Sequence, residues 1–299
     1  MKNITRAHLA LLGTNLFFAI NFTAIKYLIN AGFILPFGLN LVRAGISTLL
    51  LWLLFIVKPT KVSIRKKDIG RFLLCALLGI AFNQLLFVKG LSLTYSIHAA
   101  LLMLTTPIII ALLAYWMLRE KMTAAKLVGL LLGVAGAVIL ITGRKQGGGA
   151  TDVLLGDVLV ILNAVAYAFY FILVKPLMKT YNAIGIIRIL FTIGFFMMLP
   201  FCWEEYRQIN FSSYTPVAWL CLLCISVCGT FLAYVFNIYG IKVLGAATAG
   251  AYIYLQIVFS SVIAVIFLHE QVNAIKLIAA GCIVLGVYLS NYNKKNAQL

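Results

Sequence analysis

Two segments of this 299-residue sequence read LREKMTAAKLVGLLLGVAGAVILITG (Leu118–Gly143) and LHEQVNAIKLIAAGCIVLGVYL (Leu268–Leu289). Each segment has a Glu (Glu120 or Glu270) and, six residues later, a Lys (Lys126 or Lys276). An apolar run that contains glycine follows the Lys. Apolar matches arise easily between such segments, but charged residues make up only 10% of the chain, so the shared Glu and Lys are informative. Similarity at a fixed offset is the signature of an internal repeat. We therefore predict that the chain contains two copies of one unit.

The composition is that of an integral membrane protein. Hydrophobic residues make up 64% of the chain, against roughly 45–50% in soluble globular proteins, and the mean hydropathy is +1.07. This excludes a soluble enzyme, a disordered chain and a secreted disulfide scaffold. The formal charge of +17 does not indicate nucleic-acid binding, because the basic residues lie in short runs between apolar segments and not on one polar face.

The apolar segments predict an all-α integral membrane fold with ten transmembrane helices. About 20 mainly apolar residues are needed to cross the hydrocarbon as a helix, whereas barrel strands are about 10 residues long and alternate in polarity. The expected spans are residues 8–30, 37–57, 70–88, 95–117, 124–142, 156–174, 183–202, 215–238, 246–268 and 273–292. Most of the 24 Lys and Arg then fall on the side of the N-terminus, which predicts that both termini are cytoplasmic in the cell membrane.

The repeat divides these spans into two five-helix units, residues 1–145 and 152–299, joined near the glycine run 147–149. An odd number of spans makes each unit leave the membrane on the side opposite its entry, so the second copy is inverted relative to the first. Inverted repeats are typical of secondary transporters, in which two copies rock about a site at the midplane.

These features resemble the EamA-type drug/metabolite transporter superfamily. The resemblance rests on the two quoted segments, on LLGTNLFFAINFTAIK (Leu11–Lys26) and on the pair Thr106-Pro107, whose proline is replaced by Ile257 in the second copy. It implies a carrier of the cytoplasmic membrane with a central cavity lined mainly by the third, fourth, eighth and ninth helices, together with the first and sixth. The superfamily transports amino acids, other metabolites, sugars and phosphorylated compounds.

Polar side chains inside the spans are few and are candidates for substrate contact. Such groups face the bundle interior or a watery cavity, where they find hydrogen-bond partners. The alternative is that they only join helices, at about 0.6 kcal/mol for each bond. The expected substrate-binding residues are Asn15, Asn21, Gln84, His98, Tyr170, Tyr234, Tyr252 and Gln256.

Two arginines inside spans suggest gates. Arg43 and Glu270 are expected near the outer ends of their spans, and Arg188 and Glu120 at equivalent depths on the inner side. A lone arginine in hydrocarbon costs at least about 2.5–3.5 kcal/mol, and pairing with a carboxylate offsets part of this cost. We predict the pairs Arg43–Glu270 and Arg188–Glu120; the alternative is that the arginines reach headgroups and the glutamates cap loops.

No motif for catalysis, a metal or a cofactor is complete. His269-Glu270 lacks the second His of a zinc motif because position 273 is Asn, and no nucleotide-binding P-loop is present. We therefore predict a secondary transporter, not an enzyme, that exports small organic metabolites such as amino acids by alternating access. Its expected partners are a small-molecule substrate and the lipid bilayer, without nucleic acid, and it is expected to act as a monomer. The alternative is an intramembrane enzyme or a membrane assembly protein.

Overall fold

A computed structural model describes residues 2–57, 63–94, 105–119, 123–142 and 152–268, with isolated positions at 59, 99, 102–103 and within 277–289. Every regular element in these ranges is helical, as the sequence predicts. In chain order the main helices are α1 (Lys2–Asn30), α2 (Pro36–Val57), α3 (Ile69–Ala76), α4 (Phe82–Leu93), α6 (Thr105–Leu118), α7 (Ala124–Thr142), α8 (Val153–Thr180), α9 (Ala183–Arg207), α10 (Pro216–Leu223), α11 (Ala233–Leu244), α12 (Ala246–Ala251) and α13 (Ile253–Leu268).

Six helical segments are long and apolar enough to cross a membrane. They contain the first, second, third, sixth, seventh and eighth spans that the sequence predicts, and thereby confirm those six as apolar helices. The six segments are Asn3–Asn30, Pro36–Val57, Lys66–Leu93, Val153–Thr180, Ala183–Arg207 and Pro216–Leu244. The fifth span corresponds to α7, the ninth to α12 and α13, and the second half of the fourth to α6. Much of the first half of the fourth span and most of the tenth, 273–292, lie outside the described residues.

Two of the long segments contain a π-helix that the sequence did not predict. The segment η2 (Leu77–Ala81) joins α3 to α4, and η4 (Cys224–Leu232) joins α10 to α11. Gly79 lies in η2 and Gly229 in η4, and the internal repeat aligns these two glycines. A π-helix adds a residue to the turn, which changes the faces that the following helix presents, and it is frequent at functional sites.

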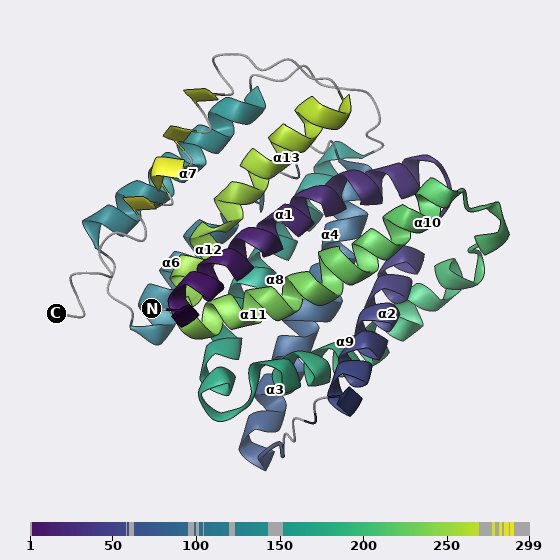
Figure 1. Cartoon of the computed structure of the whole chain (residues 1–299), viewed down its shortest axis with the longest axis horizontal. Helices are drawn as coiled ribbons and strands as arrows, with labels where there is room; N and C mark the ends of the chain where they lie inside the picture. The colour runs from purple at the N-terminus through teal and green to yellow at the C-terminus, as the bar shows by residue number, and fades with distance from the viewer. Residues whose placement is uncertain are drawn as a thin grey trace.

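The first helix, α1, packs between helices from the C-terminal half of the chain. Figure 1 shows α1 lying between α11 and α13, and these are among its most extensive neighbours. Similarly, α8 packs against α4 and α6, while α2 packs against α9. Elements from the first and second halves of the sequence are therefore interleaved, and the largest helix contacts join the two halves.

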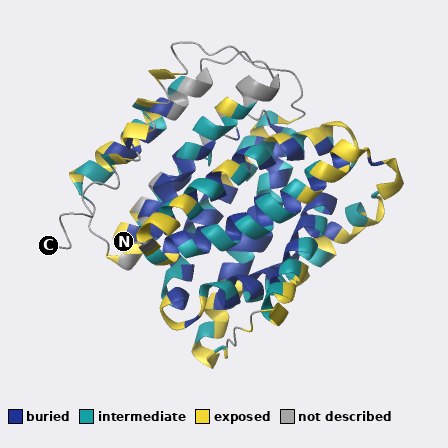
Figure 2. Cartoon of the chain, viewed as in Figure 1, coloured by how far each residue is buried: buried dark blue, intermediate teal, exposed yellow. Residues whose placement is uncertain are grey.

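The side chains follow the polarity expected of a membrane protein. Buried residues occupy the middle of the bundle, and exposed ones cover its outer faces and ends (Figure 2). Many exposed residues on the outer faces are large and apolar, for example Leu49, Ile56, Phe196 and Leu220. Soluble proteins rarely expose apolar patches of this extent, whereas lipid tails solvate them.

Close helix contact at Gly79 gives a test of this packing. A Cβ built on Gly79 would overlap the ring of Tyr170, which is fully buried, and forced overpacking costs about 1–3 kcal/mol. We expect Gly79→Ala to lower the melting temperature of the detergent-purified protein. Gly70→Ala is the control, because nothing lies within 4 Å of its built Cβ. A Gly79→Ala protein that melts at or above the wild-type temperature would contradict this packing.

Candidate functional site

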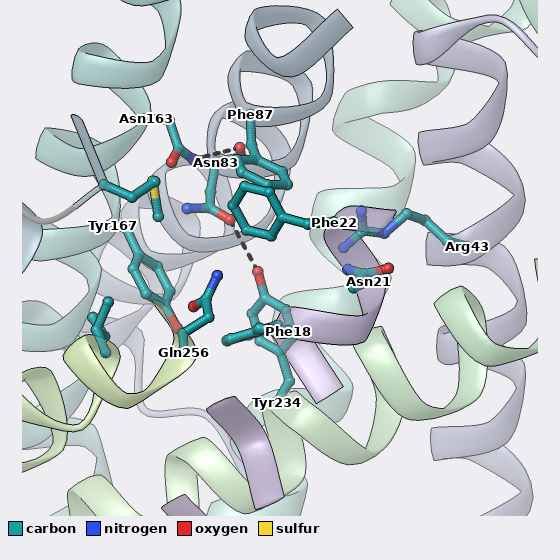
Figure 3. Close-up of a pocket in the computed structure, with 12 residues that line it drawn as sticks. Phe18, Asn21, Phe22, Arg43, Asn83, Phe87, Asn163, Tyr167, Tyr234 and Gln256 are labelled. Carbon is teal, nitrogen blue, oxygen red and sulfur yellow. Dashed lines mark hydrogen bonds between the residues drawn. The ribbon is translucent and has the colours of Figure 1, made fainter. Parts of the chain in front are cut away.

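A small cavity lies where α1, α2, α4, α8, α11 and α13 meet (Figure 3). Its volume is about 50 Å³, which is room for a few water molecules. The lining combines amide, hydroxyl and guanidinium groups with aromatic and aliphatic ones. The lining residues are Phe18, Asn21, Phe22, Arg43, Asn83, Phe87, Met103, Asn163, Tyr167, Tyr234, Ile253 and Gln256.

Asn83 is the centre of a hydrogen-bond network that joins three helices. The Tyr234 hydroxyl of α11 lies 3.1 Å from both the Asn83 Oδ1 and the Gly79 carbonyl oxygen. The Asn163 amide of α8 donates to the Asn83 backbone carbonyl at 2.7 Å. Nearby, the Asn237 amide donates to the Tyr167 hydroxyl. These bonds fix the polar wall of the cavity, and they link α4 of the first half to α8 and α11 of the second.

Arg43 brings a positive charge to the cavity from α2. Its side chain is only 3% exposed, and its Nε donates to the Thr230 hydroxyl at 3.0 Å. Thr230 lies in the π-helix η4, and its hydroxyl donates in turn to the Ile225 carbonyl at 2.8 Å. The Thr230 hydroxyl is therefore oriented to accept the hydrogen bond from Arg43. The terminal Nη1 is buried and makes no hydrogen bond to any described residue. The guanidinium therefore has hydrogen-bonding capacity that no described residue uses.

Three residues of the predicted substrate site line this cavity: Asn21, Tyr234 and Gln256. Four others are buried but are not among its lining residues. Asn15 donates to the Leu11 carbonyl one turn earlier in α1, and the Tyr252 hydroxyl is paired with the His8 ring. Tyr170 packs against Gly79, and Gln84 is buried without lining the cavity. The eighth, His98, lies outside the described residues.

The lining also contains residues that the sequence prediction left out of the site. Asn83, Asn163 and Tyr167 are polar residues inside spans, so their polarity was the available signal. Gln84 is predicted for the site because its helix is expected to line the cavity, whereas its neighbour Asn83 is the one found in the lining. The apolar lining residues, such as Phe22 and Phe87, give no signal in a chain this hydrophobic.

The predicted gate pairs remain predictions, because Glu120 and Glu270 lie outside the described residues. The arginines themselves have different surroundings. Arg43 contacts Thr230, as above, whereas the Arg188 guanidinium carbon lies 3.8 Å from the ring centre of Phe55 and 4.9 Å from that of Trp52. Arg188 is therefore held partly by aromatic rings of α2, a contact that stabilises guanidinium groups.

Carboxylates in the described part of the chain have roles at helix ends. Glu205 accepts hydrogen bonds from the Phe37 and Gly38 backbone N–H groups, which caps the first turn of α2. Asp68 accepts from the Tyr181 hydroxyl at 2.7 Å, and Asp157 accepts from the Thr94 hydroxyl. None of these three lines the cavity.

Comparisons with known proteins give one matching family pattern, several related sequences and a structure of the same fold. The sequence pattern of the EamA-like transporter family matches residues 5–142 and, a second time, residues 154–292. A Bacillus subtilis protein named uncharacterized transporter YetK is 26% identical over 250 residues, which are 83% of this chain and 76% of that protein. An uncharacterized transporter of Clostridium kluyveri is 23% identical over 98% of this chain and 95% of its own length. A crystal structure shares the fold with a TM-score of 0.73 at 17% identity, covering 97% of this chain and 98% of the other.

Removing the Tyr234 hydroxyl tests the network around Asn83. In Tyr234→Phe the buried Asn83 Oδ1 loses its hydrogen bond, and an unsatisfied buried polar atom costs about 1–3 kcal/mol. We expect a lower melting temperature in detergent. Tyr239→Phe is the matched control, because the Tyr239 hydroxyl makes one long, exposed contact to the Asn3 carbonyl. Equal melting temperatures for the two variants would show that the Tyr234 bonds do not support the fold.

Proposed function

The chain belongs to the EamA-like transporter family, and on that premise we propose that it is a secondary transporter that exports small organic metabolites, amino acids among them. The solute crosses the cytoplasmic membrane through the cavity at Asn83 by alternating access. The observation that carries this proposal is the cavity itself, a polar site among apolar membrane-spanning helices, built by both halves of the chain. The first half contributes Asn21 and Asn83, and the second contributes Tyr234 and Gln256.

The helix contacts support two equivalent halves of five spans, residues 1–145 and 152–299. In the proposed order, α1 and α8 are the first spans of the two halves. Each packs against the third and fourth spans of the other half: α1 against α11 and α13, and α8 against α4 and α6. The family pattern also matches the chain twice, once in each proposed half.

Individual residue contacts show the same reciprocal packing between the two proposed halves. A Cβ on Gly240 of α11 would meet Leu11 of α1, and a Cβ on Gly90 of α4 would meet Val160 of α8. Gly90 aligns with Gly240 in the internal repeat, and Leu11 aligns with Val160 at the offset that pairs Lys26 with Lys175. Because five spans are odd, halves of this kind are inverted relative to each other and can exchange conformations, which opens the shared site to either side.

The cavity volume favours a closed conformation of this cycle. About 50 Å³ is far below the roughly 300–1,000 Å³ of pockets that hold drug-sized ligands. Relative movement of the halves would widen the cavity on one side at a time. No feature of the site favours the alternative, an intramembrane enzyme or assembly protein.

The experiment is transport itself. Metabolites that accumulate outside cells overexpressing the protein, relative to a deletion strain, identify candidate solutes, and counterflow in proteoliposomes then tests each one. The proposal also includes cytoplasmic termini and a monomeric protein. A reporter enzyme that is active only in the cytoplasm should therefore be active when it is fused to the C-terminus. Failure of every candidate solute in counterflow would overturn the transport proposal.

Two asparagines of α1 give a matched pair for the site. Asn21 lines the cavity, whereas Asn15 is 2% exposed and bonded within its own helix. We expect Asn21→Ala to lower counterflow about tenfold, the factor that a loss of 1.4 kcal/mol gives, and Asn15→Ala to have a smaller effect. A larger loss in Asn15→Ala would move the site away from this cavity.

A further inference from the structure

The charges around the cavity are unbalanced. Among its twelve lining residues, Arg43 is basic and none is acidic. In Figure 3 the guanidinium of Arg43 extends from α2 toward the cavity, next to Asn21 and Phe22. The remaining polar lining groups are neutral amides and hydroxyls, so the site as described has a net positive charge.

The guanidinium is positioned but not saturated with hydrogen bonds. Its Nε is fixed by Thr230 at 3.0 Å, while Nη1 is buried without a hydrogen-bond acceptor in the described part of the chain. Asn21, beside it, has an amide NH₂ that can act as a second donor, while its buried Oδ1 has no hydrogen-bond partner in the described part of the chain. A guanidinium presents parallel N–H groups that match the two oxygens of a carboxylate.

The rest of the lining is suited to an apolar body. Phe18, Phe22 and Phe87 lie around the cavity together with Met103 and Ile253. The rings of Phe22 and Phe87 meet edge to face, with centroids 5.0 Å apart. An ammonium group entering the site would meet amide oxygens, hydroxyls and rings, but no carboxylate of the lining, and it would be repelled by Arg43.

From these observations we propose that Arg43 binds the carboxylate group of the transported solute, and that the solute is a small organic carboxylate with an apolar or aromatic body. Thr230 is a positioning residue, since it orients the guanidinium through Nε. This inference rests on the proposed transport function and names the substrate class of the same cavity. The solute carboxylate supplies the negative charge that the lining lacks.

The test is a series of isosteres that differ in one group. Phenylacetate, phenylacetamide and phenethylammonium share an aromatic body, as butyrate, butyramide and butylammonium share an aliphatic one, and L-phenylalanine adds the zwitterion. Binding to the detergent-purified full chain is measured by calorimetry and by thermal stabilisation. We expect at least one carboxylate to bind about tenfold or more tightly than its amide, as charge-assisted bidentate contact allows, and the ammonium compounds not to bind.

Three variants identify the group responsible. Arg43→Gln should reduce carboxylate binding to the level of the amide, and Arg43→Lys should keep part of the preference, which also covers the case in which Arg43→Gln does not fold. Arg207→Gln is the control: it removes an exposed positive charge at the end of α9 and should bind like the wild type.

Several results would overturn the inference. These are the absence of carboxylate binding to the wild type, equal binding of carboxylate and amide, or a preference that survives Arg43→Gln. A carboxylate preference that is absent in the wild type and is seen only in Glu270→Gln would also overturn it, because Arg43 would then be paired with Glu270 in the wild type. Transport of neutral or cationic solutes that is lost in Asn21→Ala would refute the inference and leave the transport function intact. Arg43-dependent carboxylate binding without transport of any solute would refute only the transport function.

Discussion

The structure depends on the inability of lipid tails to form hydrogen bonds. Polar groups at membrane depth must therefore find partners inside the protein, and this constraint gathers the few polar side chains of the spans at the centre of the bundle. Asn83 bonds to Tyr234, and Asn163 bonds to the Asn83 backbone. The outer faces carry large apolar residues instead. A cavity that contains polar groups among apolar helices is the direct consequence.

Close helix contact allows both halves of the chain to reach this cavity. Gly79 accommodates the Tyr170 ring of α8, and Gly229 accommodates the Asn21 side chain of α1. Both glycines lie in π-helices, so η2 lies where α8 packs closely and η4 lies where α1 packs closely. The same segments carry the polar contacts of the site, since η4 contributes Thr230 and the Gly79 carbonyl of η2 lies next to the Tyr234 hydroxyl.

The long apolar helices could be predicted from the sequence, whereas the polar residues inside them could not be ranked by it. Runs of about 20 apolar residues predicted the six long helices correctly. Of the polar residues predicted for the substrate site, Asn21, Tyr234 and Gln256 line the cavity, and their role in substrate binding stays a prediction. Polarity alone cannot separate a cavity residue from one that only bonds within the bundle, which is why Asn15 was included. Asn83 and Gln84 are adjacent polar residues of one span, so composition alone could not tell which of the two lines the cavity. Whether Glu120 and Glu270 pair with the arginines stays a prediction.

The most direct test of the account is the accessibility of the cavity from the two sides of the membrane. A single cysteine at Phe22, which lines the cavity, is introduced after the six native cysteines have been replaced. It is then treated with a membrane-impermeant maleimide in right-side-out and inside-out vesicles. Alternating access predicts labelling from both sides, slowed by a bound solute. Labelling from one side only, or from neither, would contradict the account.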